Sequence, residues 1–282
     1  MSIKELNLDE WYFFSDRHNS IVYISNDEKW LVKLFAPGFG DSLEDLQKEQ
    51  AFSRRVYDMG VRTPDVGEIV RVGDKVGLVF ENIQNKTSFS RQIKNDPDSI
   101  EEVGRNFARL CKGLHQTECD TGFFPSRKGM LLKFAEECDI VSEEERARII
   151  AFLKALPDDT KCIHGDLHTG NAIFNDDGEY FIDLGMFAYG DPILDVSIFY
   201  AFSHFMPEFV KENIFYTNGE GARKLWESFA EEYFGVKSGS PEMEDLDRRM
   251  APIASMNLLL FHDKKPMPFD RGLFEQFMLP TI

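Results

Sequence analysis

The sequence predicts an α+β chain with two lobes, a small one built on an antiparallel sheet and a larger, mainly helical one after it. Two observations predict this order. Short apolar or alternating segments with turn residues between them fill roughly the first 80 residues. Further along, serine residues with the spacing of helix N-caps precede long segments of helical periodicity. At 282 residues, the chain is long enough for both lobes.

The first lobe is expected to contain four strands and one helix. The strand segments are apolar or alternating, with turn residues inside each consecutive pair. The helix is predicted over about 42–59 and ends at Gly60, a residue type that favours the position after a helix C-terminus. The four predicted strands are residues 21–25, 30–35, 68–72 and 75–80.

The second lobe begins after a polar connector, and a hinge is expected at about residues 81–88. We therefore expect one domain over residues 1–83 and another over residues 84–282. The apolar side chains of the first long helix in the second domain share one helical face. Three helix N-terminal signals lie in this domain: Ser99-Ile-Glu-Glu102, Ser142-Glu-Glu-Glu145 and Ser240-Pro241.

Net charge and composition disfavour several classes of protein. The chain has 32 basic and 49 acidic side chains, a formal charge of −17, whereas binding to nucleic acids or anionic membranes requires a basic surface. No apolar run approaches the roughly 20 residues of a membrane-spanning helix, and the start lacks the apolar core of a signal peptide. The four cysteines have no CxxC spacing, so we expect a cytoplasmic protein, with secretion after processing as the alternative.

Residues 162–174 contain the most informative motif, His164-x-Asp166-x-x-x-x-Asn171. This is the spacing of a kinase catalytic loop, in which the Asp takes the proton of the substrate and the Asn holds a metal. Because three fixed residues also coincide by chance, the motif needs support from its context.

The context is a predicted β-hairpin directly after the motif. Apolar runs at 172–174 and 179–182 flank a turn rich in Asn, Asp and Gly. Asn171 lies just before the first arm and Asp183 just after the second, so arms of equal length bring the two side chains close. Two oxygen ligands at one place suit Mg²⁺, a hard ion that also binds phosphates.

Three segments of the chain, taken together and in their order along the sequence, resemble the aminoglycoside phosphotransferase and choline kinase-like family, which has the protein-kinase-like fold. They are His164-Gly-Asp-Leu-His-Thr-Gly-Asn171, Ile182-Asp-Leu-Gly185 and Gly190-Asp-Pro-Ile-Leu-Asp195. Weaker matches, including Leu114-His115 and Gly60-Val-Arg-Thr-Pro64, extend the similarity from about residue 22 to residue 203. The resemblance therefore implies a two-lobed protein-kinase-like fold.

The resemblance also implies roles for individual residues. Asp166 resembles the catalytic base, and Asn171 and Asp183 resemble the metal ligands. Lys33 is similar to the strand lysine that contacts the nucleotide phosphates, and Glu49 is similar to its ion-pair partner.

Two further sets of residues complete the implied site. His164 and Asp195 match positions that support the catalytic loop. The phosphate-covering loop is expected near residues 15–20, which contain no glycine, unlike the corresponding loop of protein kinases. The segment whose backbone is expected to bind adenine comprises Phe80, Glu81, Asn82 and Ile83.

Several residues keep a second interpretation. Lys33 by itself is a solvated strand lysine, and His168 is either a loop residue or a substrate contact. Asp195 is interpreted as a hydrogen-bonding partner of the loop rather than as a metal ligand. The acids that compete with Glu49 are Glu44, Asp45 and Glu81. Helix packing is favoured over a substrate pocket for the aromatic run Phe199, Tyr200, Phe202, Phe205 and Phe209.

The predicted activity is Mg²⁺-dependent transfer of the γ-phosphate of ATP to a hydroxyl group of a small molecule, with GTP as the alternative donor. Only the 11 residues 184–194 separate Asp183 from Asp195, which leaves no room for the long segment on which a protein kinase docks a polypeptide. The alternatives are a nucleotide-binding pseudokinase that regulates a partner and a protein Ser/Thr kinase.

Overall fold

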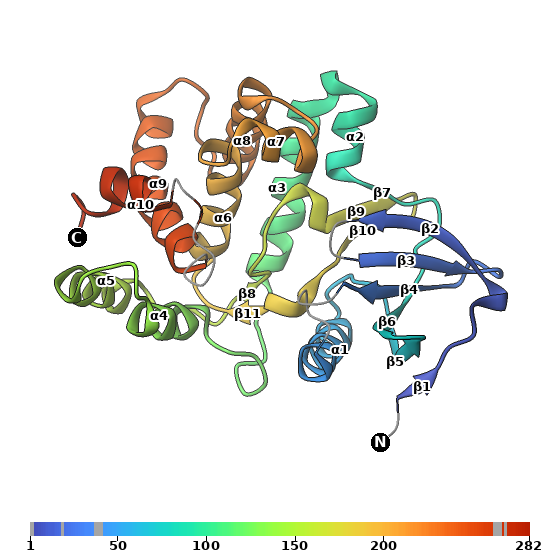
Figure 1. The fold of residues 1–282 in the computed structure, drawn as a ribbon. Coiled ribbons are helices and arrows are strands. Elements are labelled where there is room, and N and C mark those ends of the chain that lie inside the picture. Colours follow the sequence, from blue (N-terminus) through green and yellow to red (C-terminus); the bar gives the residue numbers. More distant parts are fainter. Residues whose placement is uncertain (1–2, 18–19, 37–41, 262–266, 268–269) are drawn as a thin grey trace. The chain divides into compact units, whose positions relative to one another are not determined.

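The computed structural model describes residues 3–17, 20–36, 42–261, 267 and 270–282 (Figure 1). The chain divides into two compact units: Met1–Thr87 with Ala172–Gly185, and Ser88–Asn171 with Met186–Ile282. This division differs from the expected domains 1–83 and 84–282 in its boundary and in one internal segment. Residues 172–185 belong to the first unit because hydrogen bonds attach them to Arg62 and Gln84.

The first unit is built on a six-stranded sheet in the order β1-β5-β6-β4-β3-β2, in which the only parallel pair among the described strands is β1 with β5. The four predicted strands are confirmed as β3 to β6, visible side by side in Figure 1. The strand bounds are β1 Lys4–Glu5, β2 Trp11–Arg17, β3 Ser20–Ser25, β4 Trp30–Phe35, β5 Val66–Val72 and β6 Lys75–Glu81.

Strand β2 corrects the expected position of the phosphate-covering loop. Residues 15–17 were expected in that loop, but they continue the strand and pair with β3 as far as Ser20. Of the other residues of the expected loop, Ser20 begins β3, and His18 and Asn19 lie outside the described residues. The sequence pattern does not reveal β2 because this edge strand exposes consecutive aromatic side chains instead of alternating them, and its register shifts between Phe13 and Ser15.

Helix α1, Leu43–Asp58, follows the predicted course. The Ser42 hydroxyl accepts a hydrogen bond from the Asp45 amide at 3.0 Å, and Gly60 has φ +81°, the left-handed conformation expected after a helix. The helix places Leu46 in a buried cluster with side chains of the sheet, Phe35, Val66 and Leu78.

The predicted β-hairpin is confirmed by β9, Ala172–Asn175, and β10, Gly178–Phe181. Its arms have equal length, since Ala172 pairs with Phe181 and Asn175 pairs with Gly178. Strand β7, Thr87–Ser88, extends this hairpin to a three-stranded sheet. Arg62 secures the hairpin, because its guanidinium donates to the Asp177 carbonyl at 2.7 Å and its carbonyl accepts from the Phe181 amide at 2.9 Å.

The second unit is mainly helical and contains one short strand pair, β8 Cys162–Ile163 with β11 Ala188–Tyr189. Among its described helices, none is both long and apolar enough to cross a bilayer. The helix bounds are α2 Phe89–Asn95, α3 Ile100–Gln116, α4 Arg127–Glu137, α5 Glu143–Ala155, α6 Ile193–His204, α7 Glu208–Ile214, α8 Gly219–Phe234, α9 Pro241–Phe261 and α10 Asp270–Leu273.

Two of the three predicted helix starts in this unit are confirmed, and one is wrong in its details. Ser142 and Glu145 form both hydrogen bonds of a capping box, and α9 begins at Pro241 directly after Ser240. Ser99 instead ends a 3-10 turn, Pro97–Ser99, and its hydroxyl donates to the Asp96 carbonyl. Because that turn runs straight into α3, Ser99 has helical dihedral angles and its side chain does not cap the helix.

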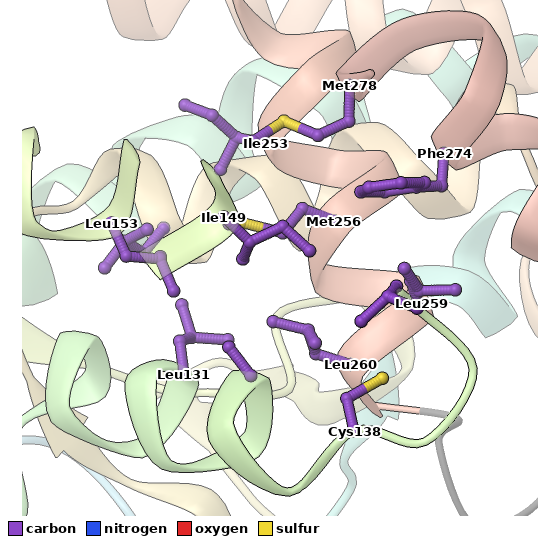
Figure 2. Packing of buried hydrophobic residues seen from close by; sticks show 13 residues of the cluster. Leu131, Cys138, Ile149, Leu153, Ile253, Met256, Leu259, Leu260, Phe274 and Met278 are labelled. Atoms are coloured by element: carbon purple, nitrogen blue, oxygen red, sulfur yellow. The ribbon is translucent and has the colours of Figure 1, made fainter. Parts of the chain in front are cut away.

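A buried cluster joins α4, α5, α9 and the C-terminal segment (Figure 2). Leu131 of α4 and Ile149 of α5 face Met256 of α9, and Phe274 and Met278 close the cluster from the chain end. On the other side of the unit, α3 and α8 approach closely at Gly104, where an added Cβ would overlap the side chain of Ser228. These contacts hold the helices of the second unit together.

Candidate active site

In the first unit, Lys33 and Asp183 come together although 150 residues separate them. The Lys33 Nζ forms an ion pair with Asp183 Oδ1; the Lys33 side chain is largely shielded from solvent, whereas Asp183 is exposed. Lys33 lies on β4, and Asp183 follows the β9–β10 hairpin with φ +61°. A non-glycine residue in this conformation is held there by its surroundings, as is common at functional sites.

Glu49 of α1 is the acid that faces this ion pair. Its pKa is raised mainly by burial, and the charge of Asp183 raises it further while the charge of Lys33 lowers it. The competing acids have other surroundings. Glu44 and Asp45 are exposed, and the Glu81 carboxylate accepts from the Asp65 amide at 3.1 Å.

The hinge segment is held by hydrogen bonds to its neighbours. Phe80 and Glu81 belong to β6, which pairs with both β4 and β5. The Asn82 amide donates to the Lys29 carbonyl at 2.8 Å, and its side chain donates to the Glu28 carbonyl at 2.8 Å. The Ile83 carbonyl accepts from Lys86 Nζ at 3.2 Å. The backbone of this segment is therefore fixed.

In the second unit, the catalytic loop begins at the end of β8 and turns sharply at Gly165. This residue has φ +83°, and an added Cβ would overlap the Met186 carbonyl, so the turn requires glycine. Asp166 and Asn171 lie together after the turn. The Asn171 Nδ2 donates to both the carbonyl oxygen and Oδ2 of Asp166, each at 3.0 Å.

Asp195 holds the backbone of this loop from α6. Its two carboxylate oxygens accept from the His164 amide at 2.8 Å and the Gly165 amide at 2.9 Å. Burial by itself would raise the Asp195 pKa, but the hydrogen bond and charge of His115 and the interactions of His164 outweigh it, so the pKa is lowered. An ionised, fully buried Asp195 therefore clamps the loop.

His115 and Tyr233 extend this support and were not predicted as site residues. His115 Nε2 lies 3.0 Å from Asp195 Oδ2, and its Nδ1 lies 2.7 Å from the Tyr233 hydroxyl. The pair Leu114-His115 already resembled the family in the sequence, so a signal for His115 existed. No local pattern pointed to Tyr233, which is 118 residues further along the chain.

His168 and the aromatic run lie close to the loop. His168 Nδ1 accepts from the Gly170 amide at 3.0 Å, its Nε2 lies 3.9 Å from Asp166 Oδ2, and its ring packs against Phe202. Phe199 and Tyr200 are buried and contact Trp226, which fits helix packing. Phe209 differs, because 59% of it is exposed.

The donor atoms of the expected metal ligands fit Mg²⁺. In the second unit, the Asn171 Nδ2 donates to Asp166, which leaves the amide oxygen as the atom that could ligate a cation. In the first unit, Asp183 offers carboxylate oxygens, the other ligand type that Mg²⁺ prefers. Among the described residues, no cluster of three or more His, Cys, Asp or Glu side chains could hold a metal ion.

The fold is the two-lobed, protein-kinase-like fold. Residues 13–231 match the phosphotransferase enzyme family (APH), and the chain belongs to that family. The predicted resemblance and the predicted enzyme class, a kinase that acts on a hydroxyl group, are thereby confirmed. No curated protein matches the sequence.

Solved structures of small-molecule kinases share the fold. A thermostable mutant of aminoglycoside phosphotransferase APH(4)-Ia, in a complex with ADP and hygromycin B, superposes with a TM-score of 0.64 at 10% identity, covering 96% of this chain and 93% of the other. Aminoglycoside phosphotransferase APH(3'')-Id from Streptomyces rimosus gives 0.54 at 18% identity, with 89% and 92% covered. A choline/ethanolamine kinase family protein from Mesorhizobium loti gives 0.53 at 15% identity, with 96% and 86% covered.

Proposed function

We propose that this chain transfers the γ-phosphate of ATP, in a Mg²⁺-dependent reaction, to a hydroxyl group of a small molecule. The observation that carries the proposal is the joint fixation of Asp166 and Asn171. Two hydrogen bonds from one side-chain amide tie them together, and Asp195 clamps the backbone before them. Phosphoryl transfer depends on positioning and charge stabilisation, which a pre-formed loop supplies.

The residues of the first unit are assigned to the nucleotide. Lys33 binds the phosphates, and Glu49 orients Lys33 from α1. The backbone of residues 80–83 binds the adenine ring. Asp183, together with Asn171 of the second unit, would hold Mg²⁺, which neutralises phosphate charge when it is bound. The ion pair of Lys33 with Asp183 fits this assignment, because both groups would act on the same phosphates, Lys33 directly and Asp183 through the metal ion.

The residues of the second unit are assigned to the acceptor. Asp166 accepts the proton of the acceptor hydroxyl, whose oxygen attacks the γ-phosphorus as the bond to the β-phosphate oxygen breaks. His164 and Asp195 hold the loop so that the Asp166 carboxylate keeps its orientation. The helices after Ser197 form the acceptor pocket and set specificity.

A small acceptor is favoured over a polypeptide by the segment between Asp183 and Asp195. It folds into a short 3-10 turn, Leu184–Met186, and strand β11, which pairs with β8, before α6 begins at Ile193. Such a segment offers no docking platform for a peptide. The related solved structures contain ATP, ADP or AMP-PNP together with aminoglycosides or amicoumacin, which supports ATP and a hydroxylated small molecule here.

The test is transfer of labelled phosphate from Mg²⁺-ATP, and separately from Mg²⁺-GTP, to two pools of acceptors. One pool contains aminoglycosides, amino alcohols, sugars and nucleosides, and the other contains generic proteins and peptides. We expect transfer to a member of the first pool that disappears in Asp166→Asn. Transfer to the protein pool alone would indicate a protein kinase. Tight binding of Mg²⁺-ATP without transfer to any acceptor would indicate the pseudokinase alternative.

A further inference from the structure

Lys86 lies just after the hinge segment, and its ammonium group binds back onto that segment. Its Nζ donates to the Asn82 Oδ1 and, at 3.2 Å, to the Ile83 carbonyl. The Asn82 side chain is buried and fixed, because its Nδ2 donates to the Glu28 carbonyl at 2.8 Å. An ammonium group has donors only and cannot accept a hydrogen bond. The Ile83 carbonyl is therefore occupied by a cationic donor.

The Glu81 carbonyl, by contrast, is free. Trp30 and Asp65 lie opposite Glu81 on the two sides of β6, and both donate their amides elsewhere. The Trp30 amide donates to the Ser25 hydroxyl at 3.0 Å, and the Asp65 amide donates to the Glu81 carboxylate at 3.1 Å. Within the described ranges, no donor reaches the Glu81 carbonyl, and the Ile83 amide has no acceptor.

These two free groups face the same side of the segment. The Glu81 amide donates to the Asp65 carbonyl on one side, and the Asn82 amide donates to the Lys29 carbonyl on the other, each at 2.8 Å. This is the alternation of an extended strand, in which every second residue directs its backbone groups to the same side. The hinge therefore presents a free acceptor at Glu81, a free donor at Ile83 and then the occupied acceptor of Ile83.

This order of groups is complementary to adenine and not to guanine. Adenine has a donor, its exocyclic amino group, beside the acceptor N1, which matches the Glu81 carbonyl and the Ile83 amide. Guanine has the acceptor O6 beside the donor N1–H, so in the same pose each of its groups would face a group of its own kind. Unpaired polar groups in a binding site cost affinity.

Guanine could pair with the hinge only by moving along it by one group. Its O6 would then accept from the Ile83 amide, and its N1–H would donate to the Ile83 carbonyl. That carbonyl already accepts from Lys86, whose positive charge would also face the N–H donors of guanine. Adenine does not need this carbonyl, so Lys86 affects one base and not the other.

We propose that Lys86 is a positioning residue that makes this chain select ATP over GTP, because it occupies the hinge acceptor that guanine requires. The role rests on the proposed function, which assigns the base of the nucleotide to residues 80–83. It goes further by naming the donor and the side chain that sets the preference.

The experiment measures binding of Mg²⁺-ATP, Mg²⁺-GTP and Mg²⁺-ITP to the full chain by isothermal titration calorimetry, which needs no acceptor. Lys86→Met and Lys86→Ala remove the ammonium group, and Lys86→Arg keeps a cationic donor. The matched control is Lys29→Met. Lys29 lies on the turn that contacts the same hinge, but its side chain is 74% exposed and pairs only loosely with Asp27, at 3.8 Å.

We expect the wild type to bind Mg²⁺-ATP about a hundredfold or more tightly than Mg²⁺-GTP. In Lys86→Met and Lys86→Ala, affinity for Mg²⁺-GTP should rise about tenfold, as one hydrogen bond is gained, while affinity for Mg²⁺-ATP changes little. Mg²⁺-ITP should follow Mg²⁺-GTP, because hypoxanthine shares O6 and N1–H with guanine. Lys86→Arg and Lys29→Met should keep the wild-type ratio.

Three results would overturn this role: equal affinities of the wild type for ATP and GTP, an unchanged ratio in both variants that lack the ammonium group, or the same change of ratio in Lys29→Met. Lack of binding of every nucleotide would refute the proposed function as well. A chain that transfers phosphate to no acceptor but shows the expected ratios would refute only the proposed function.

Discussion

At the scale of single residues, the two carboxylates Asp166 and Asp183 have similar chemistry but different surroundings. Asp166 accepts hydrogen bonds from Asn171 in the second unit, whereas Asp183 pairs with Lys33 in the first. This difference supports separate assignments, Asp166 to proton transfer and Asp183 to the metal and phosphates. Substitution at each position should therefore affect different steps.

The first prediction concerns these two carboxylates. In Asp166→Asn, we expect turnover to fall by about a hundredfold or more, because general-base catalysis is lost, while the affinity for Mg²⁺-ATP changes little. In Asp183→Asn, we expect Mg²⁺-ATP affinity to fall by about tenfold or more as well. Isothermal titration calorimetry of Mg²⁺-ATP into both variants separates the two roles. Wild-type affinity in Asp183→Asn would refute its assignment as a metal ligand.

A second prediction at this scale concerns the clamp of the loop. Asp195→Asn keeps the size of the side chain but replaces one acceptor oxygen by an NH₂ group that faces backbone amides and His115. Because this breaks a buried, charged network, we expect a loss of roughly 3–5 kcal/mol in unfolding free energy, measured by urea denaturation. The matched change Asp191→Asn, at the start of the same segment, should cost far less. Equal losses in the two variants would argue against the clamp.

At the scale of elements, the sharp turn at Gly165 joins β8 to the catalytic loop. Its positive φ and the closeness of the Met186 carbonyl leave no space for a side chain. Gly113 of α3 provides the opposite case, because an added Cβ there meets nothing within 4 Å. The backbone therefore requires glycine at position 165, whereas position 113 has space for a side chain.

The third prediction uses this pair. Gly165→Ala should destabilise the protein by roughly 2–5 kcal/mol, from the left-handed conformation and the overlap together, and should abolish transfer. Gly113→Ala should stabilise it by about 0.5–1 kcal/mol, because alanine loses less conformational entropy within a helix. Chemical denaturation of both variants checks the signs. A Gly165→Ala variant as stable as the wild type would contradict the strained turn.

At the scale of the whole molecule, stability in mild acid depends on opposing charge effects. The formal net charge is −17 at pH 7. As the pH falls toward the isoelectric point near 4.8, this charge approaches zero, so the repulsion among the negative side chains weakens. His204 acts in the opposite direction. Burial lowers its pKa to about 4, the charges of Lys211 and Arg223 lower it further, and a hydrogen bond to the Tyr200 carbonyl raises it. The ring stacks on Tyr200 with centroids 4.0 Å apart.

The fourth prediction follows from the sign of this shift. The unfolded chain binds the His204 proton near pH 6.5 and the folded chain only near pH 4, so the stability present above pH 6.5 is lost as the pH falls between these values. The loss amounts to at most about 3 kcal/mol. His204→Phe should remove it, so the stability difference between pH 7 and pH 4 should be smaller than in the wild type. Parallel pH profiles for the two proteins would refute the buried, neutral histidine.

The catalytic loop and the hairpin could be predicted from the sequence because their information is local. The spacing of His164, Asp166 and Asn171 lies within one loop, and a two-arm hairpin around a polar turn needs no distant partner. The strands β3 to β6 and the helix start at Ser142 follow from local periodicity and capping chemistry in the same way. Strand β2 was not predicted, because an edge strand with exposed aromatic residues lacks the alternation of a half-buried strand.

Tertiary structure alone decided which distant side chains meet. It brings Tyr233 to His115, separates Glu49 from its competitors by burial beside Lys33, and turns Ser99 away from a capping role. It also leaves the Nε and Nη1 atoms of the buried Arg127 without hydrogen-bond partners among the described residues. The physical reason is that sequence periodicity encodes which face of an element is apolar, whereas hydrogen bonds and charge pairs depend on distances between elements that only the packed fold sets.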